Sequence, residues 1–142
     1  MLTLSRSANG WMYPFVPLVA LPTGMSLVSL FGILAVAFAM ERLPYWLAKR
    51  SVRRRRPAVA LQKHCNLIVP GDEFSWPSGH TSAAFLVVTV LALAVNPAFA
   101  VLYVWAALAG FARVVVGVHF PSDVMAGAAL GSTIGALVVA GQ

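Results

Sequence analysis

Three long stretches without a charged side chain dominate this sequence. They cover residues 7–40, 81–112 and 124–142, which are 34, 32 and 19 residues long. A membrane-spanning helix needs about 20 apolar residues, so the middle stretch holds two helices, divided at Asn96-Pro97. Only 10% of the residues are charged, against roughly 25% in a soluble domain. The sequence therefore predicts an all-α, polytopic membrane helix bundle.

We expect about five to six helices in a single domain over residues 1–142, with four complete spans. Proline cannot continue a helix but suits its first turn, which sets the boundaries at Pro97 and Pro121. The expected spans are 24–47, 79–95, 98–117 and 121–140. Residues 11–21 form a short proline-containing segment without a convincing signal-peptide cleavage site, and residues 48–77 form a polar loop. The hairpin of the two middle spans puts this loop and the turn at 118–121 on one side of the membrane.

Three glycines in the last span, Gly127, Gly131 and Gly135, repeat every four residues. Small residues at this spacing let helices approach closely in lipid. The pattern predicts a packing face, either inside the fold or between the protomers of a homo-oligomer.

The basic residues concentrate beside the membrane spans. The net charge is +6, and Arg50 and the run 53–56 lack the interleaved aromatic residues expected of a nucleic-acid site. Anionic lipid headgroups are the better partner, although a plain solvated surface remains the alternative for Arg50 and Arg53. The single cysteine excludes an intrachain disulfide, and Cys65 beside His64 supplies too few ligands for a metal site.

The remaining ionisable residues form three blocks at the ends of apolar segments, where a charge is costly and usually functional. In the second block, Ser78, Gly79 and His80 stand where an apolar run follows the polar loop, so we expect a helix to begin there. Serine is a favoured helix cap, and the free N–H groups of a first turn bind anions. Gly79 permits close approach to the backbone, and His80 can donate a proton. A plain capped helix start is the alternative interpretation.

The third block contains Arg113, His119 and Asp123. A carboxylate that accepts a hydrogen bond from one imidazole nitrogen fixes the tautomer and frees the other nitrogen as a nucleophile. Asp123 also suits a helix N-terminus electrostatically. The Arg113 guanidinium offers a planar set of donors that matches a phosphate. In the first block, Lys49 and Arg56 add positive charge of the kind that stabilises a phosphoryl group in transfer.

Together the blocks read Lys49-(six residues)-Arg56-Pro57, then Pro77-Ser78-Gly79-His80, then Arg113-(five residues)-His119-(three residues)-Asp123. This order and spacing resembles the signature of the type 2 phosphatidic acid phosphatases, membrane enzymes related in fold to vanadium haloperoxidases. The resemblance covers most of the chain. Ala112 departs from the pattern, which usually has serine before the arginine, and the chain is short for a six-helix member.

The resemblance implies a covalent phosphohistidine mechanism. His119 would attack phosphorus, Asp123 would orient and stabilise it, and His80 would protonate the leaving oxygen. No metal or cofactor is needed in that family. The phosphate oxygens would be held by five residues: Lys49, Arg56, Ser78, Gly79 and Arg113.

The sequence thus favours a phosphatase acting on a membrane lipid: a polyprenyl phosphate or diphosphate, phosphatidic acid or phosphatidylglycerol phosphate. A non-catalytic binder or transporter of lipid phosphates is the alternative. We expect a multi-pass protein of the cell (inner) membrane. The side of the active site stays open, because the basic residues favour the cytoplasm whereas many relatives work on the outer side.

Overall fold

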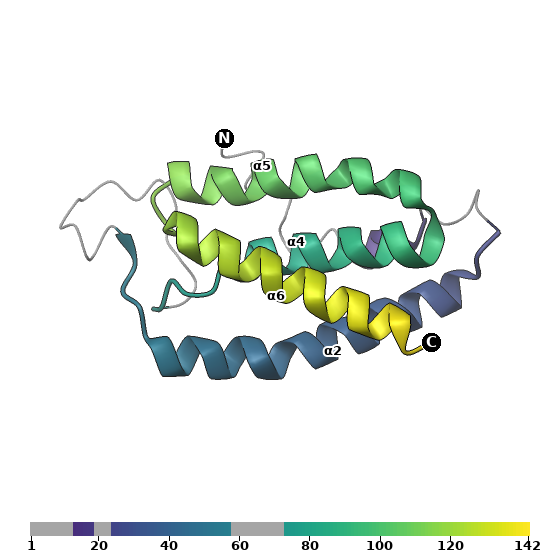
Figure 1. Cartoon of the computed structure of the whole chain (residues 1–142), viewed down its shortest axis with the longest axis horizontal. Helices are drawn as coiled ribbons and strands as arrows, with labels where there is room; N and C mark the ends of the chain where they lie inside the picture. Colours follow the sequence, from purple (N-terminus) through teal and green to yellow (C-terminus); the bar gives the residue numbers. More distant parts are fainter. Residues whose placement is uncertain (1–12, 19–23, 58–72) are drawn as a thin grey trace.

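The computed structural model describes residues 13–18, 24–57 and 73–142, and the architecture in this part is a bundle of helices. The four long helices are α2 (Leu27–Val52), α4 (Gly79–Val90), α5 (Leu102–Val115) and α6 (Pro121–Ala140). A π-helical turn, η2 (Leu91–Val95), and a 3₁₀ turn, η3 (Pro97–Val101), join α4 to α5. Helix α4 lies at the centre of the bundle, in contact with α2, α5 and α6 (Figure 1).

Within the described residues, three helical segments are long and apolar enough to cross a membrane. They are Leu27–Val52, Pro97–Val115 and Pro121–Ala140, and the apolar segment Gly79–Val95 is shorter. Large side chains such as Val28, Phe111 and Met125 are exposed on the outside of the bundle, as expected where the solvent is lipid. The structure confirms the all-α membrane bundle, and one of the four expected spans is the shorter, central α4–η2 segment.

The C-terminal end of α2 differs from the sequence prediction. The helix continues to Val52 instead of ending at residue 47, so Lys49 lies in its last turn and not in a loop. Lysine and arginine are good helix formers, and their charge is favourable at a helix C-terminus. Arg53, with φ of 46°, adopts the left-handed conformation that ends the helix. Of the segment 11–21, the structure describes only residues 13–18, a short 3₁₀ helix.

The glycine face of α6 packs against α4 of the same chain. A Cβ added at Gly131 would lie 2.0 Å from the Ser82 carbonyl oxygen, and one at Gly127 would lie 2.4 Å from that of Ser78. These glycines are buried, which confirms the packing face inside the fold. The glycine face is therefore covered by α4 of the same chain, and the homo-oligomer stays a prediction.

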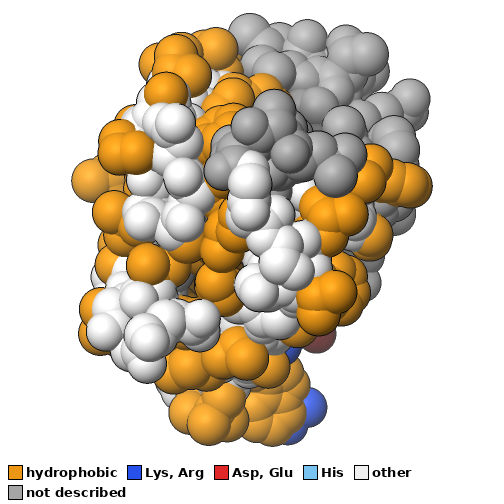
Figure 2. Space-filling view, turned by 90° about the vertical axis from the view of Figure 1, so that its right-hand side faces the viewer, with side chains coloured by type: hydrophobic (Ala, Val, Ile, Leu, Met, Phe, Trp, Pro, Cys, Tyr) orange, Lys and Arg blue, Asp and Glu red, His pale blue; other side chains and the backbone are white. Residues whose placement is uncertain are grey.

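Hydrogen bonds bring the three sequence blocks to one end of the bundle. An isolated antiparallel bridge pairs Arg55 with Phe74, and the Ser75 N–H donates to the Arg54 carbonyl at 2.8 Å. The Ser78 N–H donates to the Asp123 carbonyl at 2.9 Å. The prediction that the polar loop and the 118–121 turn share one side is confirmed for these residues. Figure 2 shows the opposite end, where most of the coloured side chains on the described surface are hydrophobic.

Candidate active site

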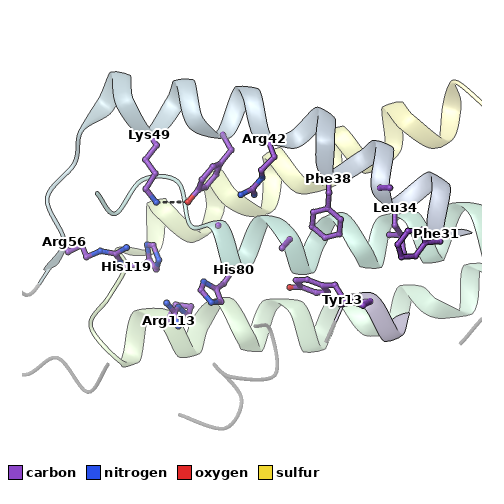
Figure 3. Close-up of a pocket in the computed structure, with 15 residues that line it drawn as sticks. Tyr13, Phe31, Leu34, Phe38, Arg42, Lys49, Arg56, His80, Arg113 and His119 are labelled. Atoms are coloured by element: carbon purple, nitrogen blue, oxygen red, sulfur yellow. Dashed lines mark hydrogen bonds between the residues drawn. The ribbon is translucent and has the colours of Figure 1, made fainter. Parts of the chain in front are cut away.

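A cavity of about 640 Å³ opens beside the end of the bundle where the blocks meet. Its lining changes from basic to apolar along its length (Figure 3). The basic end contains Lys49, Arg56, Arg113, His80, His119 and Gly79, and the apolar end contains Tyr13, Pro14, Phe31, Leu34, Ala35 and Phe38. Six of the eight residues predicted for the site thus share one cavity. Ser78 and Asp123 are fully buried and do not line it.

His119 lies in the turn between α5 and α6, and its ring is buried. Its Nδ1 atom is 2.7 Å from the Ser75 carbonyl oxygen. A carbonyl oxygen only accepts, so Nδ1 carries the hydrogen, and Nε2 of the neutral ring keeps its lone pair. The Asp123 Oδ2 atom lies 3.7 Å from Nδ1, close enough for attraction but too far for a hydrogen bond. The expectation that Asp123 fixes the tautomer by a hydrogen bond is therefore corrected: the Ser75 carbonyl fixes it.

The surroundings of His119 favour its neutral form. Burial lowers the pKa of the imidazole below its usual value of 6.5, and the positive charges of Arg56 and Arg113 lower it further. The Asp123 carboxylate opposes them by raising the pKa of His119, but the net direction is downward. At neutral pH the ring is thus uncharged, which is the form in which a nitrogen lone pair can attack an electrophile.

The Asp123 carboxylate is held on two sides. Its Oδ2 accepts the Phe120 N–H at 2.7 Å, and its Oδ1 accepts from an Nη atom of Arg54 at 3.0 Å. The same Nη atom donates to the Ser122 hydroxyl, and the Arg54 guanidinium lies 4.1 Å from the centre of the Phe120 ring. Arg54 therefore holds in place the start of α6, which follows His119 in the chain.

Three basic side chains are buried at the same end. The Lys49 ammonium donates to the Tyr45 hydroxyl at 2.7 Å. An Nη atom of Arg56 donates to the Val118 carbonyl at 2.8 Å, next to His119 in the chain. Lys49, Arg56 and Arg113 are each less than a tenth exposed, so their charges act in a medium where attraction to an anion is poorly screened.

The N-terminus of α4 reaches the cavity at Gly79 and His80. Ser78 is the N-cap residue, as predicted, but its side chain makes no capping hydrogen bond. Instead its hydroxyl accepts from the Thr81 hydroxyl at 2.9 Å. A Cβ at Gly79 would lie 2.9 Å from the Tyr45 hydroxyl oxygen, so a larger residue there would collide with the ring that positions Lys49.

Sequence reasoning missed several residues of this site. Ser75 contributes through its carbonyl oxygen, which any residue type would provide, so its identity carried no signal. Tyr45 lines the cavity between two basic residues of α2, Arg42 and Lys49. The spacing 42–45–49 places all three on one helical face. The sequence would have shown this pattern if the predicted helix had continued past residue 47 to Lys49.

The comparisons with known proteins agree with this geometry. A sequence model of the PAP2 superfamily matches residues 26–142. The chain belongs to the PAP2 superfamily. This confirms the resemblance to type 2 phosphatidic acid phosphatases that the three blocks indicated. The PAP2 match includes every predicted site residue.

Individual PAP2 relatives give the same result. The chain is 37% identical over 95 residues to a decaprenylphosphoryl-5-phosphoribose phosphatase of Mycobacterium tuberculosis, over 65% of this chain and 50% of the relative. It thus spans about half the length of the curated relatives it matches. The crystal structure of LpxE from Aquifex aeolicus is 28% identical, with a TM-score of 0.81 over 98% of this chain and 82% of that one.

A second crystal structure shares the fold. It is a transmembrane PAP2-type phosphatidylglycerolphosphate phosphatase from Bacillus subtilis, 24% identical, with a TM-score of 0.75 over 96% of this chain and 72% of that one. Both solved relatives therefore have the same arrangement of helices as this chain.

Proposed function

We propose that this protein is a membrane lipid phosphate phosphatase that works through a phosphohistidine intermediate without a metal ion. The observation that carries the proposal is one cavity with two kinds of lining. Buried basic residues and a neutral histidine lie at one end, and aromatic and aliphatic side chains lie at the other (Figure 3). A lipid phosphate has the same division into an anionic head and an apolar tail.

In the first step the phosphoryl group lies among Lys49, Arg56 and Arg113, with the Gly79 N–H at the start of α4. The Nε2 lone pair of His119 attacks phosphorus, and the P–O bond to the lipid breaks. His80 donates its proton to the departing oxygen, so the lipid leaves as an alcohol or as a lipid monophosphate. The basic residues stabilise the charge on the equatorial oxygens in transfer.

In the second step a water molecule attacks the phosphohistidine. His80, now neutral, accepts a proton from that water, the P–N bond breaks, and inorganic phosphate leaves with His119 restored. Asp123 stabilises the positive imidazole ring of the intermediate from 3.7 Å. The buried Ser78 hydroxyl lies behind the α4 N-terminus, and we assign it the support of that anion site.

The cavity and the relatives support a choice of substrate class. Two of the relatives are a decaprenylphosphoryl-5-phosphoribose phosphatase and a phosphatidylglycerolphosphate phosphatase. We propose a polyprenyl phosphate or diphosphate, phosphatidic acid or phosphatidylglycerol phosphate as substrate, in the cell (inner) membrane, with anionic lipid headgroups around the basic surface. We treat residues 1–142 as one catalytic domain.

The test is release of inorganic phosphate by the purified protein in detergent with EDTA present, over a panel of these lipids. We expect turnover of at least one lipid, and a loss of about 10³-fold or more in His119→Ala, because the nucleophile is gone. A protein that binds the lipids but releases no phosphate would be the binder or transporter instead. Turnover that depends on a divalent cation, or that survives in His119→Ala, would contradict the mechanism.

A further inference from the structure

Arg42 lies where the cavity changes from basic to apolar. The residues of α2 that line the cavity follow one helical face: Phe31, Leu34 and Phe38 are apolar, and Arg42, Tyr45 and Lys49 are polar. Figure 3 shows Arg42 pointing from α2 toward the cavity, between Phe38 and Lys49. At a rise of 1.5 Å per residue, the Cα atom of Arg42 lies about 10 Å from that of Lys49 along the helix axis. Arg42 is thus the nearer of the two to the apolar end of the cavity.

The Arg42 guanidinium is held in this position by a buried carboxylate. Its Nε atom donates to Glu41 Oε2 at 2.9 Å, and an Nη atom makes a second contact with the same oxygen. Glu41 is fully buried and accepts the Ser82 hydroxyl of α4 at 2.6 Å through Oε1. The guanidinium also stacks on Tyr45, with its central carbon 4.7 Å from the centre of the Tyr45 ring. A long side chain is thus fixed by two helices.

Most N–H donors of Arg42 have no hydrogen-bond partner among the described residues. An arginine has five N–H donors, and among the described residues Arg42 hydrogen-bonds only to Glu41. Its side chain is 57% exposed, although Glu41 beside it is fully buried. Among the described residues, the cavity lining contains four Lys or Arg side chains, Arg42, Lys49, Arg56 and Arg113, and no carboxylate. Lys49, Arg56 and Arg113 surround the phosphoryl site. Arg42 therefore extends the positive charge of the lining past His80, toward the end of the cavity that takes the lipid tail.

We propose that Arg42 is a second anion subsite, which selects lipids that carry another negative group between the reacting phosphate and the tail. This inference rests on the proposed function and narrows its substrate class to lipid diphosphates and to lipids with a phosphodiester between the reacting phosphate and the tail, such as phosphatidylglycerol phosphate and phosphodiester-linked sugar phosphates. The reacting phosphoryl group lies at His119, and the adjoining phosphate of the leaving group accepts hydrogen bonds from the open N–H donors of Arg42. Charge-assisted hydrogen bonds of this kind are among the strongest in proteins.

The test compares two substrates with the same tail, farnesyl diphosphate and farnesyl monophosphate, by initial rates of phosphate release in detergent micelles. The measured quantity is the ratio of kcat/KM for the diphosphate to kcat/KM for the monophosphate. We expect the wild type to prefer the diphosphate, and Arg42→Gln to lower the ratio about tenfold or more. Arg50→Gln is the matched control, because Arg50 lies on the same helix, stacks on Trp46 and does not line the cavity.

A second variant separates anion binding from charge balance. In Glu41→Gln/Arg42→Gln the buried carboxylate no longer needs a partner, so a purely structural role of Arg42 would be rescued. We expect the double variant to keep the reduced ratio. A ratio that returns to the wild-type value, a ratio that Arg42→Gln leaves unchanged, or a wild-type preference for the monophosphate would overturn the subsite. Failure of the wild type to release phosphate from any lipid phosphate would instead refute the proposed function.

Discussion

Replacing Gly131 with alanine puts a methyl group where α4 leaves no space for one. The added Cβ would lie 2.0 Å from the Ser82 carbonyl oxygen and 2.9 Å from the Leu86 nitrogen. Both are backbone atoms of α4, so no side-chain rotation can relieve the collision. The two helices must move apart by more than about 1 Å to restore an ordinary contact, which opens space elsewhere along the face.

The expected destabilisation follows from two opposing contributions. Overpacking of a close-packed interior typically costs about 1–3 kcal/mol, and the rigid neighbours place this site at the upper end. Alanine in place of glycine inside a helix returns about 1 kcal/mol through backbone entropy. We expect Gly131→Ala to lower the free energy of unfolding by about 2 kcal/mol, and phosphate release to fall because α4 carries Gly79 and His80.

Gly32 supplies the matched control on α2. A Cβ there would meet nothing within 4 Å, so Gly32→Ala should be neutral or more stable by up to about 1 kcal/mol. The assay is unfolding of the purified variants in mixed micelles, followed by circular dichroism as the denaturing detergent increases. Equal stability of Gly131→Ala and the wild type, or equal losses in both variants, would refute the packing argument.

Two further predictions concern the residues around His119. Arg54→Gln should lower kcat about tenfold or more with a smaller change in KM, because the buried Asp123 loses a charge-assisted hydrogen bond. The control variant Arg50→Gln, at an exposed position, should keep the wild-type kcat. Similar losses of kcat in both variants would argue against a positioning role for Arg54. Burial lowers the pKa of His119. As the pH falls, the unfolded chain therefore binds a proton at this residue near pH 6.5, before the folded protein does. The stability that the neutral His119 ring contributes is thus present above pH 6.5 and is lost as the pH falls below it. Acidification from pH 8 to 5 should therefore destabilise the wild type more than His119→Gln in the same unfolding assay, and equal losses would contradict the burial of a neutral ring.

Helix boundaries were predictable where a local signal marks them. The span predicted at 121–140 coincides with α6, because Pro121 fits the first helical turn and the apolar residues run to the end. The end of α2 carried no such signal. Its basic residues favour helix as much as loop, and its terminator is an arginine in a left-handed conformation instead of the usual glycine.

The site residues divide in the same way. Spacing identified the side chains that now share the cavity, and the hairpin of two spans correctly predicted that distant blocks lie at one end. The role of Arg54 could not be read from four consecutive arginines. In the structure Arg55 pairs with Phe74. Because alternate residues of an extended segment point the same way, the side chains of Arg54 and Arg56 both point toward the loop that contains His119.

The hydrogen-bond partner of His119 was unpredictable for a different reason. Asp123, four residues along, was the obvious side-chain candidate, but a backbone carbonyl from a segment 44 residues away takes the Nδ1 hydrogen. The pairing of residues 74 and 75 with Arg54 and Arg55 brings that carbonyl to the ring. Tertiary contacts of backbone atoms leave no pattern in a single sequence.

The central claim is that His119 carries the phosphoryl group during turnover. The direct measurement is a rapid alkaline quench of the protein with a ³²P-labelled lipid phosphate, followed by proteolysis and mass spectrometry of the labelled peptide. We expect phosphohistidine at His119, stable in alkali and lost in acid, and no labelled protein from His119→Ala. Label on another residue, or turnover by the wild type without any phosphorylated protein under single-turnover conditions, would contradict the account.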